Sequence, residues 1–227
     1  MEFTLPKVLR DLRVQSDAAV HLRDYYHSAA RGSIPTYSGS RFEAFPTAEA
    51  PATPPNEITA EDLLAVQCLG VGFSGDQALW VLDVKRADIT ELLCRIPLDW
   101  TLWGDPDVVG SDEVTELWDT LRSINGVGPT RASKLMARKR PNLCPIFDSR
   151  VRAALGARNS VGWDEHYRDL MRSKDDHGHE LHERIGQLIG RLSEEEDSDI
   201  PQNLAVLRAC DVILWMEQKK SGKVASA

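Results

Sequence analysis

The sequence has few cysteines, no long apolar run and no excess of positive charge, and each absence disfavours a class of protein. Its cysteines, Cys68, Cys94, Cys144 and Cys210, are at least 26 residues apart and form no C-x-x-C pair. Zinc and iron–sulfur sites usually draw on closely spaced cysteines, so both kinds of site are disfavoured. Each cysteine is expected to be a small buried side chain or a partly exposed thiol. We expect no metal and no cofactor.

No apolar stretch approaches the roughly 18 residues needed to span a bilayer, and the N-terminus lacks the apolar core of a signal peptide. We therefore expect a soluble, cytoplasmic protein. The net charge of −8 argues against coating DNA over the whole surface, although it leaves room for one focused site. With 227 residues, 42% of them hydrophobic, the chain can form one large domain or two small ones.

Strand-like alternation of apolar and polar residues is also missing, and apolar residues recur at helical spacing instead. Ser16 is placed to cap a first helix, and Thr59 with Asp62 forms a capping-box pattern for another. The proline-rich stretch 31–57 reads as a long loop. The sequence predicts an all-α fold, with helices at about 17–30, 59–69, 74–82, 87–95, 112–124, 149–155, 163–172, 176–192 and 202–219.

The most informative segment runs from Ile124 to Leu155. It starts with the turn Gly126-Val127-Gly128, continues into a helix, and ends with Asp148 at the start of another helix. Glycines let the backbone turn sharply and leave N–H groups exposed at the helix start, which suits a phosphate. Residues 126–158 hold eight of the 27 Lys/Arg residues but only one acid, Asp148. A basic island in an acidic protein is typical of a polyanion contact.

This segment resembles the helix-hairpin-helix superfamily of DNA base-excision glycosylases. In that family a glycine-valine-glycine hairpin precedes a helix, and an aspartate opens the next helix at the separation seen here between Gly126 and Asp148. The resemblance covers about 32 residues well. The whole chain also resembles an uncharacterised bacterial family of unknown function, and that resemblance implies no activity.

The glycosylase resemblance implies a two-lobed helical fold with a helix-hairpin-helix motif. Residues 58–145 would form a barrel-like lobe. The N-terminal helix and loop, 1–57, would pack with a second lobe, 146–219, and 220–227 would be a disordered tail.

By the same resemblance, Asp148 would be catalytic, because a carboxylate can stabilise positive charge on the sugar and orient a water molecule. Thr130 stands where bifunctional members carry a lysine, which implies a monofunctional enzyme that forms no imine. The partner would be duplex DNA, contacted by Gly126, Val127, Gly128, Thr130, Arg131, Lys134, Arg138 and Arg150.

Other interpretations of these residues remain open. In one alternative the turn joins two helices without a ligand, and Asp148 only caps its helix. Residues 138–140 would then be a solvated helix end. The chain would be a non-catalytic DNA-binding module or a protein-interaction domain. Its oligomeric state is open.

Several residues outside this segment also bear on function. His177, His179 and His182 are expected to form a polar helix start rather than a metal site. Asp211 interrupts an apolar helix and should pair with an arginine from 150–158, or else line a pocket. Residues Tyr37, Arg41 and Glu43 are expected to pack ordinarily, although they could close over a ligand. Trp163 and Trp215 are expected in the core.

Overall fold

The computed structural model describes residues 5–27, 34–46, 52–104, 111–156 and 163–224. Within these ranges the regular elements are helices, and the only β-structure is an isolated bridge between Lys174 and Glu180. The all-α prediction is therefore confirmed. No helix in these ranges is both long enough and apolar enough to cross a membrane.

The chain divides into two compact units. The central unit is Ser38–Ile146, and the terminal unit combines Met1–Tyr37 with Phe147–Ala227. The resemblance had assigned residues 38–57 to the side of the N-terminal helix, whereas here they belong to the central unit.

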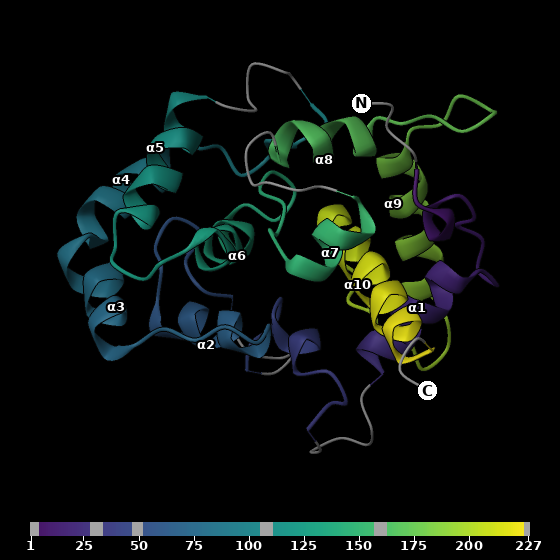
Figure 1. The fold of residues 1–227 in the computed structure, drawn as a ribbon, viewed down its shortest axis with the longest axis horizontal. Coiled ribbons are helices and arrows are strands. Elements are labelled where there is room, and N and C mark those ends of the chain that lie inside the picture. The colour runs from purple at the N-terminus through teal and green to yellow at the C-terminus, as the bar shows by residue number, and fades with distance from the viewer. Residues whose placement is uncertain (1–4, 28–33, 47–51, 105–110, 157–162, 225–227) are drawn as a thin grey trace. The chain divides into compact units, whose positions relative to one another are not determined.

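The central unit contains five α-helices among its described residues (Figure 1). Helix α6 lies next to α2 and α5, and α4 packs on α5. A short 3₁₀ helix, η2, comes first, and a π-helical turn, η3, continues α3. The bounds are η2 Ser38–Arg41, α2 Ala60–Cys68, α3 Gly75–Leu79, η3 Trp80–Val84, α4 Arg86–Arg95, α5 Asp112–Arg122 and α6 Pro129–Lys139.

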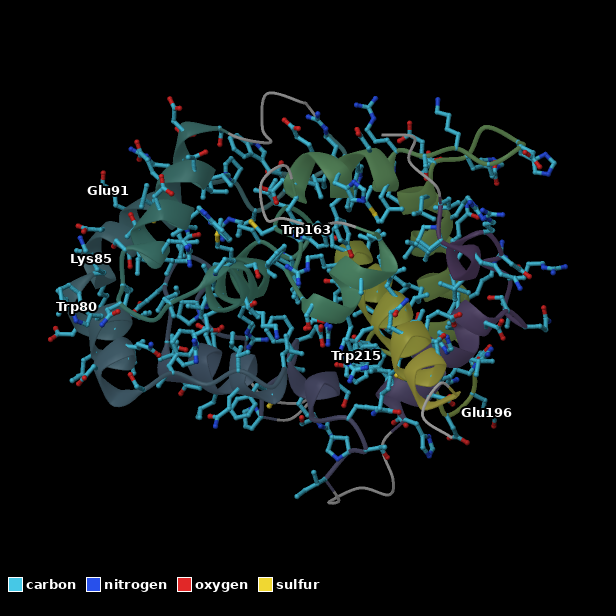
Figure 2. All side chains as sticks on the ribbon, in the orientation of Figure 1. Trp80, Lys85, Glu91, Trp163, Glu196 and Trp215 are labelled. Carbon is cyan, nitrogen blue, oxygen red and sulfur yellow. The ribbon has the colours of Figure 1, made fainter. Side chains whose placement is uncertain are left out.

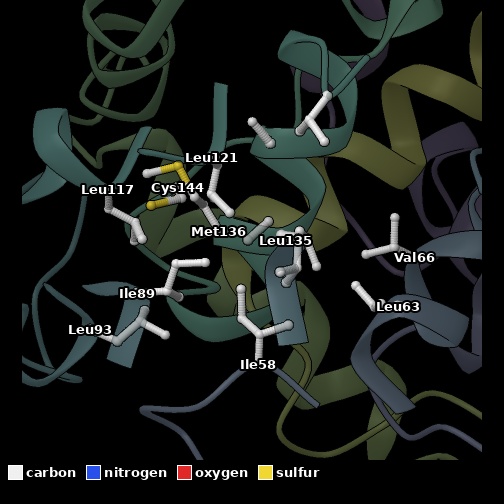
Figure 3. Close-up of a cluster of buried hydrophobic side chains, with 14 of the residues drawn as sticks. Ile58, Leu63, Val66, Ile89, Leu93, Leu117, Leu121, Leu135, Met136 and Cys144 are labelled. Atoms are coloured by element: carbon white, nitrogen blue, oxygen red, sulfur yellow. The ribbon is translucent and has the colours of Figure 1, made fainter. Parts of the chain in front are cut away.

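Apolar side chains one helical turn apart form the core of the central unit. Ile89 and Leu93 lie on one face of α4, and Leu117 and Leu121 on one face of α5. These side chains gather around Leu135 and its neighbours on α6 (Figure 3). Burying these faces stabilises helices that would be marginal in isolation, because helices this short are rarely stable alone in water.

The terminal unit is built around its last helix (Figure 1). Helix α10 packs against α1, α7 and α9 and is apolar on most sides from Leu207 to Met216, as expected of a buried helix. The bounds are η1 Lys7–Leu9, α1 Asp17–Tyr26, α7 Ser149–Ala154, α8 Trp163–Met171, α9 Leu181–Ser193 and α10 Val206–Val224.

Most helix starts agree with the capping signals. The Ser16 hydroxyl accepts the N–H of Ala19 at 3.3 Å, and the N–H of Thr59 donates to Asp62 at 2.8 Å. Helix α9 starts at Leu181 rather than 176, because a loop with Gly178 at φ +85° precedes it. Helix α10 extends to Val224, into the segment expected to be disordered, and residues 225–227 lie outside the described ranges.

Candidate functional site

The turn between α5 and α6 is built on Gly126. Its φ of +79° lies in the left-handed region, and a Cβ at this position would be 2.4 Å from the Gln77 side-chain nitrogen. Val127, next in the chain, is 2% exposed and donates its N–H to Ile124 at 2.9 Å. The turn therefore requires glycine at 126 and is anchored in the core at 127.

Three side chains donate hydrogen bonds to the carbonyl groups of this turn. Gln77 donates to the Asn125 carbonyl at 3.2 Å and Arg131 to the Gly126 carbonyl at 2.9 Å. Arg122 donates to the Val127 carbonyl at 3.1 Å. Consecutive carbonyls are thus held from three elements, which fixes the backbone of the turn.

Several N–H groups of the same turn, unlike its carbonyl groups, have no hydrogen-bond partner among the described residues. Those of Gly126, Gly128 and Thr130 donate to no acceptor within the described part of the chain. Gly128 is the N-cap of α6, where no side chain caps the helix and no acid lies in the first turn. Elsewhere Ser16, Ser74, Ser111 and Asp148 cap their helices with side-chain oxygens. The start of α6 is left as a set of amide donors, suited to an anion.

Two cations expected at a DNA contact instead donate hydrogen bonds to the loop between α2 and α3. Lys134 is 2% exposed, and its Nζ donates to the Leu69 carbonyl at 2.9 Å. Arg131 is half-buried and donates through Nε to the Gly72 carbonyl at 2.6 Å. The two side chains hold residues 69–72 against α6, so Lys134 is not displayed for a partner.

Arg138, another expected contact, is also turned inward. Its side chain is 8% exposed, its Nε lies 3.0 Å from Asp62, and it donates to the carbonyls of Phe42 and Glu43. Lys139 beside it is 2% exposed and lies 2.5 Å from the other Asp62 oxygen. These cations neutralise a buried acid and do not form a surface patch.

Arg140 completes this internal network. It is 1% exposed and donates to the carbonyls of Leu93, Ile96 and Pro55 and to the side chain of Asn56. The run 138–140 is therefore neither the solvated helix end nor the binding patch that the sequence suggested. A guanidinium has five donors, which allows one side chain to satisfy several buried loop carbonyls.

Asp62 at the centre of the network is fully buried. Burial favours its neutral form, but hydrogen bonds from Lys139 and the Thr59 backbone outweigh this effect, so the pKa of Asp62 lies below its usual value. The pKa of Lys139 also lies below its usual value. Burial is the main cause, and the positive charges of Arg138 and Arg140 act in the same direction. The carboxylate stays charged at neutral pH.

Asp148 lies in the terminal unit as the N-cap of α7. Its Oδ1 accepts the N–H of Arg150 at 2.8 Å, so the capping interpretation of this residue is confirmed. The side chain is half-buried. Capping explains why an aspartate stands here, and it leaves the catalytic interpretation to experiment.

Arg150 belongs to an aromatic cluster in the terminal unit. Its guanidinium carbon lies 5.5 Å from the centre of the Trp215 ring, and the Lys219 nitrogen lies 5.1 Å from the same centre. Tyr37 meets Trp215 edge-on at 5.9 Å and stacks on Tyr25 at 5.3 Å. Neither Arg150 nor Lys219 forms an ion pair with a carboxylate of the described residues. Two cations thus converge on one indole.

Trp215, which lies on α10 (Figure 2), differs from the core position expected for it, because it is only partly buried. Trp163 is 5% exposed and packs edge-on against Phe147 at 5.2 Å, as expected of a core residue. Trp215 stands between Leu214 and Met216, whereas Trp163 is followed by Asp164 and Glu165, so the sequence neighbours do not indicate which ring is buried. Only the packing around them distinguishes a core residue from one at a surface cluster.

Asp211 and the histidines occupy separate places in the terminal unit. Tyr167, which the sequence did not indicate, donates a hydrogen bond to Asp211. Arg158, one of the arginines expected to pair with it, lies outside the described residues. His182 contacts the Met171 carbonyl at 3.2 Å, and the described residues hold no group of three His, Cys, Asp or Glu arranged for a metal ion.

A family model described as a family of unknown function (DUF6308) matches residues 18–218. Neither the curated proteins nor the solved structures include a match to this chain.

Proposed function

We propose that this chain, which belongs to the DUF6308 family, binds nucleic acid through the turn between α5 and α6. In this proposal the N–H groups of Gly126, Gly128 and Thr130 hold one backbone phosphate. The positive end of the α6 dipole favours the same anion.

The observation that carries the proposal is the contrast between the two sides of the turn. The carbonyls of residues 125–127 are engaged by side chains, whereas three nearby N–H groups have no described acceptor. A rigid set of unengaged donors binds an anion with little cost of ordering. The resemblance of residues 124–155 to helix-hairpin-helix proteins supports a phosphate of nucleic acid as that anion.

Arg131 supports the turn indirectly in this proposal. It bridges the carbonyls of Gly126 and Gly72, so it connects the turn to the loop before α3. Lys134 and Arg138 are not part of the proposed contact, since both are consumed inside the unit.

A salt series of binding measurements tests the proposal. Fluorescence anisotropy with labelled duplex DNA, single-stranded DNA and RNA should reveal an affinity that falls as salt rises, because phosphate contacts release bound counterions. An affinity that does not change with salt concentration, or no binding to any of the probes, would instead favour a protein-interaction domain.

A second candidate function is hydrolysis of a base N-glycosidic bond, supported by the cluster that begins two residues after Asp148. Such a reaction needs a flipped base to stack and a carboxylate to stabilise the positive sugar. Trp215 and Tyr37 offer rings for stacking, and Asp148 is the candidate acid. Water would add to the sugar carbon, and the base would leave carrying a proton.

The variant Asp148→Asn tests this chemistry with little structural change. Asparagine also caps helices, and its oxygen can accept the Arg150 N–H. Base release from duplexes carrying several lesions should disappear while duplex affinity stays within about twofold, because the helix cap that positions α7 is retained. Ser149→Ala, one residue on, serves as the control. Undiminished release by the asparagine variant would remove Asp148 from the mechanism.

A further inference from the structure

A separate cavity of about 520 Å³ opens on the terminal unit, between the segment 10–13, the loop 174–180 and α9. Four arginines, two histidines, two aspartates, a leucine and a glutamine line it. Its volume lies within the range of about 300–1,000 Å³ that is common for small-ligand sites. Neither proposed function uses it.

The two aspartates of the cavity are already engaged. Asp11 receives two hydrogen bonds from the Arg13 guanidinium, at 2.9 and 2.7 Å, and one from the Arg13 backbone N–H at 3.1 Å, and these lower the pKa of Asp11 to about 2. Asp175 accepts the N–H groups of His177 and His179 at 2.9 and 3.0 Å, and lies 3.4 Å from Arg184 Nε. Each acid is therefore matched by one arginine.

The other two arginines have no such match. Neither Arg10 nor Arg191 pairs with a carboxylate of the described residues, and both are exposed. The exposed ring of His177 adds a further nitrogen-bearing group to the rim. Two unmatched arginines in one cavity of a protein with net charge −8 leave a local excess of positive charge.

The cations are also spread along α9, and Arg184 among them is held in place. Arg184 is held by its bond to the Arg10 carbonyl at 2.7 Å, and its side chain is only 13% exposed. Arg184, Gln187 and Arg191 follow one face of α9. Seven residues of helix put the first and last about 10 Å apart. A chain of phosphoryl groups meets both ends at once more readily than a single phosphate does.

We propose that this cavity binds an oligophosphate, a chain of two or three phosphoryl groups. Arg10 and Arg184 contact one end, Arg191 contacts the other, and Gln187 donates between them. Apart from the two imidazoles no ring lines the cavity, so a nucleobase has no stacking surface and the recognised group is the phosphate chain itself.

Calorimetric titration of the whole chain with tripolyphosphate tests this, with sulfate at equal ionic strength as the comparison. Saturable binding of tripolyphosphate that is at least about tenfold tighter than sulfate is expected, because only the longer anion reaches both unmatched arginines. Arg10→Gln and Arg191→Gln should each weaken it about tenfold. Both residues are exposed, so folding should be retained, and Arg86→Gln in the central unit is the matched control.

The same chemistry could come from a free oligophosphate or from a nucleic-acid backbone. If duplex DNA displaces the probe and the Arg10 and Arg191 variants weaken both ligands, the source is a backbone. If duplex DNA does not displace it, the ligand is free. Absence of saturable binding at millimolar probe, equal affinity for sulfate, or unchanged affinity in both variants would overturn the proposal. The tripolyphosphate titration does not depend on the turn at α6. Failure of the oligophosphate proposal can therefore be told apart from failure of nucleic-acid binding at that turn.

Discussion

Replacing Gly128 by aspartate should separate the stability of the α6 turn from its capacity to bind an anion. Gly128 has no left-handed φ, and the nearest atom to an added Cβ is Arg122 Nη1 at 3.7 Å, an ordinary contact. The position therefore accepts a side chain. Aspartate is a favoured N-cap, and its carboxylate would accept the Thr130 N–H, one of the three donors that the proposal assigns to phosphate.

The two expected effects have opposite signs. An acid at a helix N-terminus adds about 0.3–1 kcal/mol of stability, which for a chain of this length raises Tm by at most about 4 °C. Hydrogen bonds to a charged group are worth about 1.5–3 kcal/mol each. Loss of one such bond, about 1.5–3 kcal/mol, weakens nucleic-acid binding by about 10- to 100-fold.

Thermal unfolding and anisotropy on the same preparations measure both effects. Gly128→Asn is the matched control, since it has nearly the same volume and capping ability without the charge. Its binding should fall between those of the wild type and the aspartate variant. Gly128→Ala, which adds only a methyl group, should bind within a few-fold of wild type.

A folded aspartate variant with wild-type affinity would refute the reasoning, because the three N–H groups could not then be the anion site. Equal losses for aspartate and asparagine would mean that volume or capping, rather than charge, governs the contact. That result would remove the electrostatic part of the proposal.

Two further predictions concern the buried network of the central unit. Asp62→Asn should lower the free energy of unfolding by about 3–5 kcal/mol, measured by urea denaturation, because it leaves Arg138 and Lys139 without their buried counter-charge. The pKa of Asp62 is lower in the folded than in the unfolded protein. Its contribution to the free energy of unfolding is therefore present above about pH 4 and is lost as pH falls through the folded pKa. The asparagine variant should lack this part of the acid dependence of stability. Arg140→Lys should lower Tm by several degrees despite the conserved charge, because lysine cannot reproduce donors to Leu93, Ile96, Pro55 and Asn56; an unchanged Tm would contradict the bracing role.

Local signals in the sequence were sufficient for most of the helices and for the turn. Capping residues such as Ser16 and Thr59 act within three residues of themselves, so their effect is visible without a fold. The requirement for glycine at 126 follows from backbone geometry. The capping role of Asp148 is equally local.

The direction in which charged side chains point was not local information. Residues 131–140 read as a basic island, yet Lys134, Arg138 and Arg140 serve carbonyls that lie 44 to 96 residues away in sequence. Nothing in their own segment shows that segments 42–43, 54–56, 69–72 and 93–96 lie against these side chains and need donors there. A basic surface and a set of buried cations that donate to distant carbonyls therefore look alike in the sequence.

The sequence by itself determined the all-α class, the capped helix starts and the strained turn, because these depend on neighbours within one or two helical turns. The tertiary structure alone decided that Lys134, Arg138, Lys139 and Arg140 of the basic island turn inward, that Trp215 lies in a partly exposed cluster with Arg150, and that Arg10 shares a cavity with α9. These features depend on burial and on contacts between distant segments, since the low dielectric of the interior and the demand of unpaired carbonyls determine which charges turn inward.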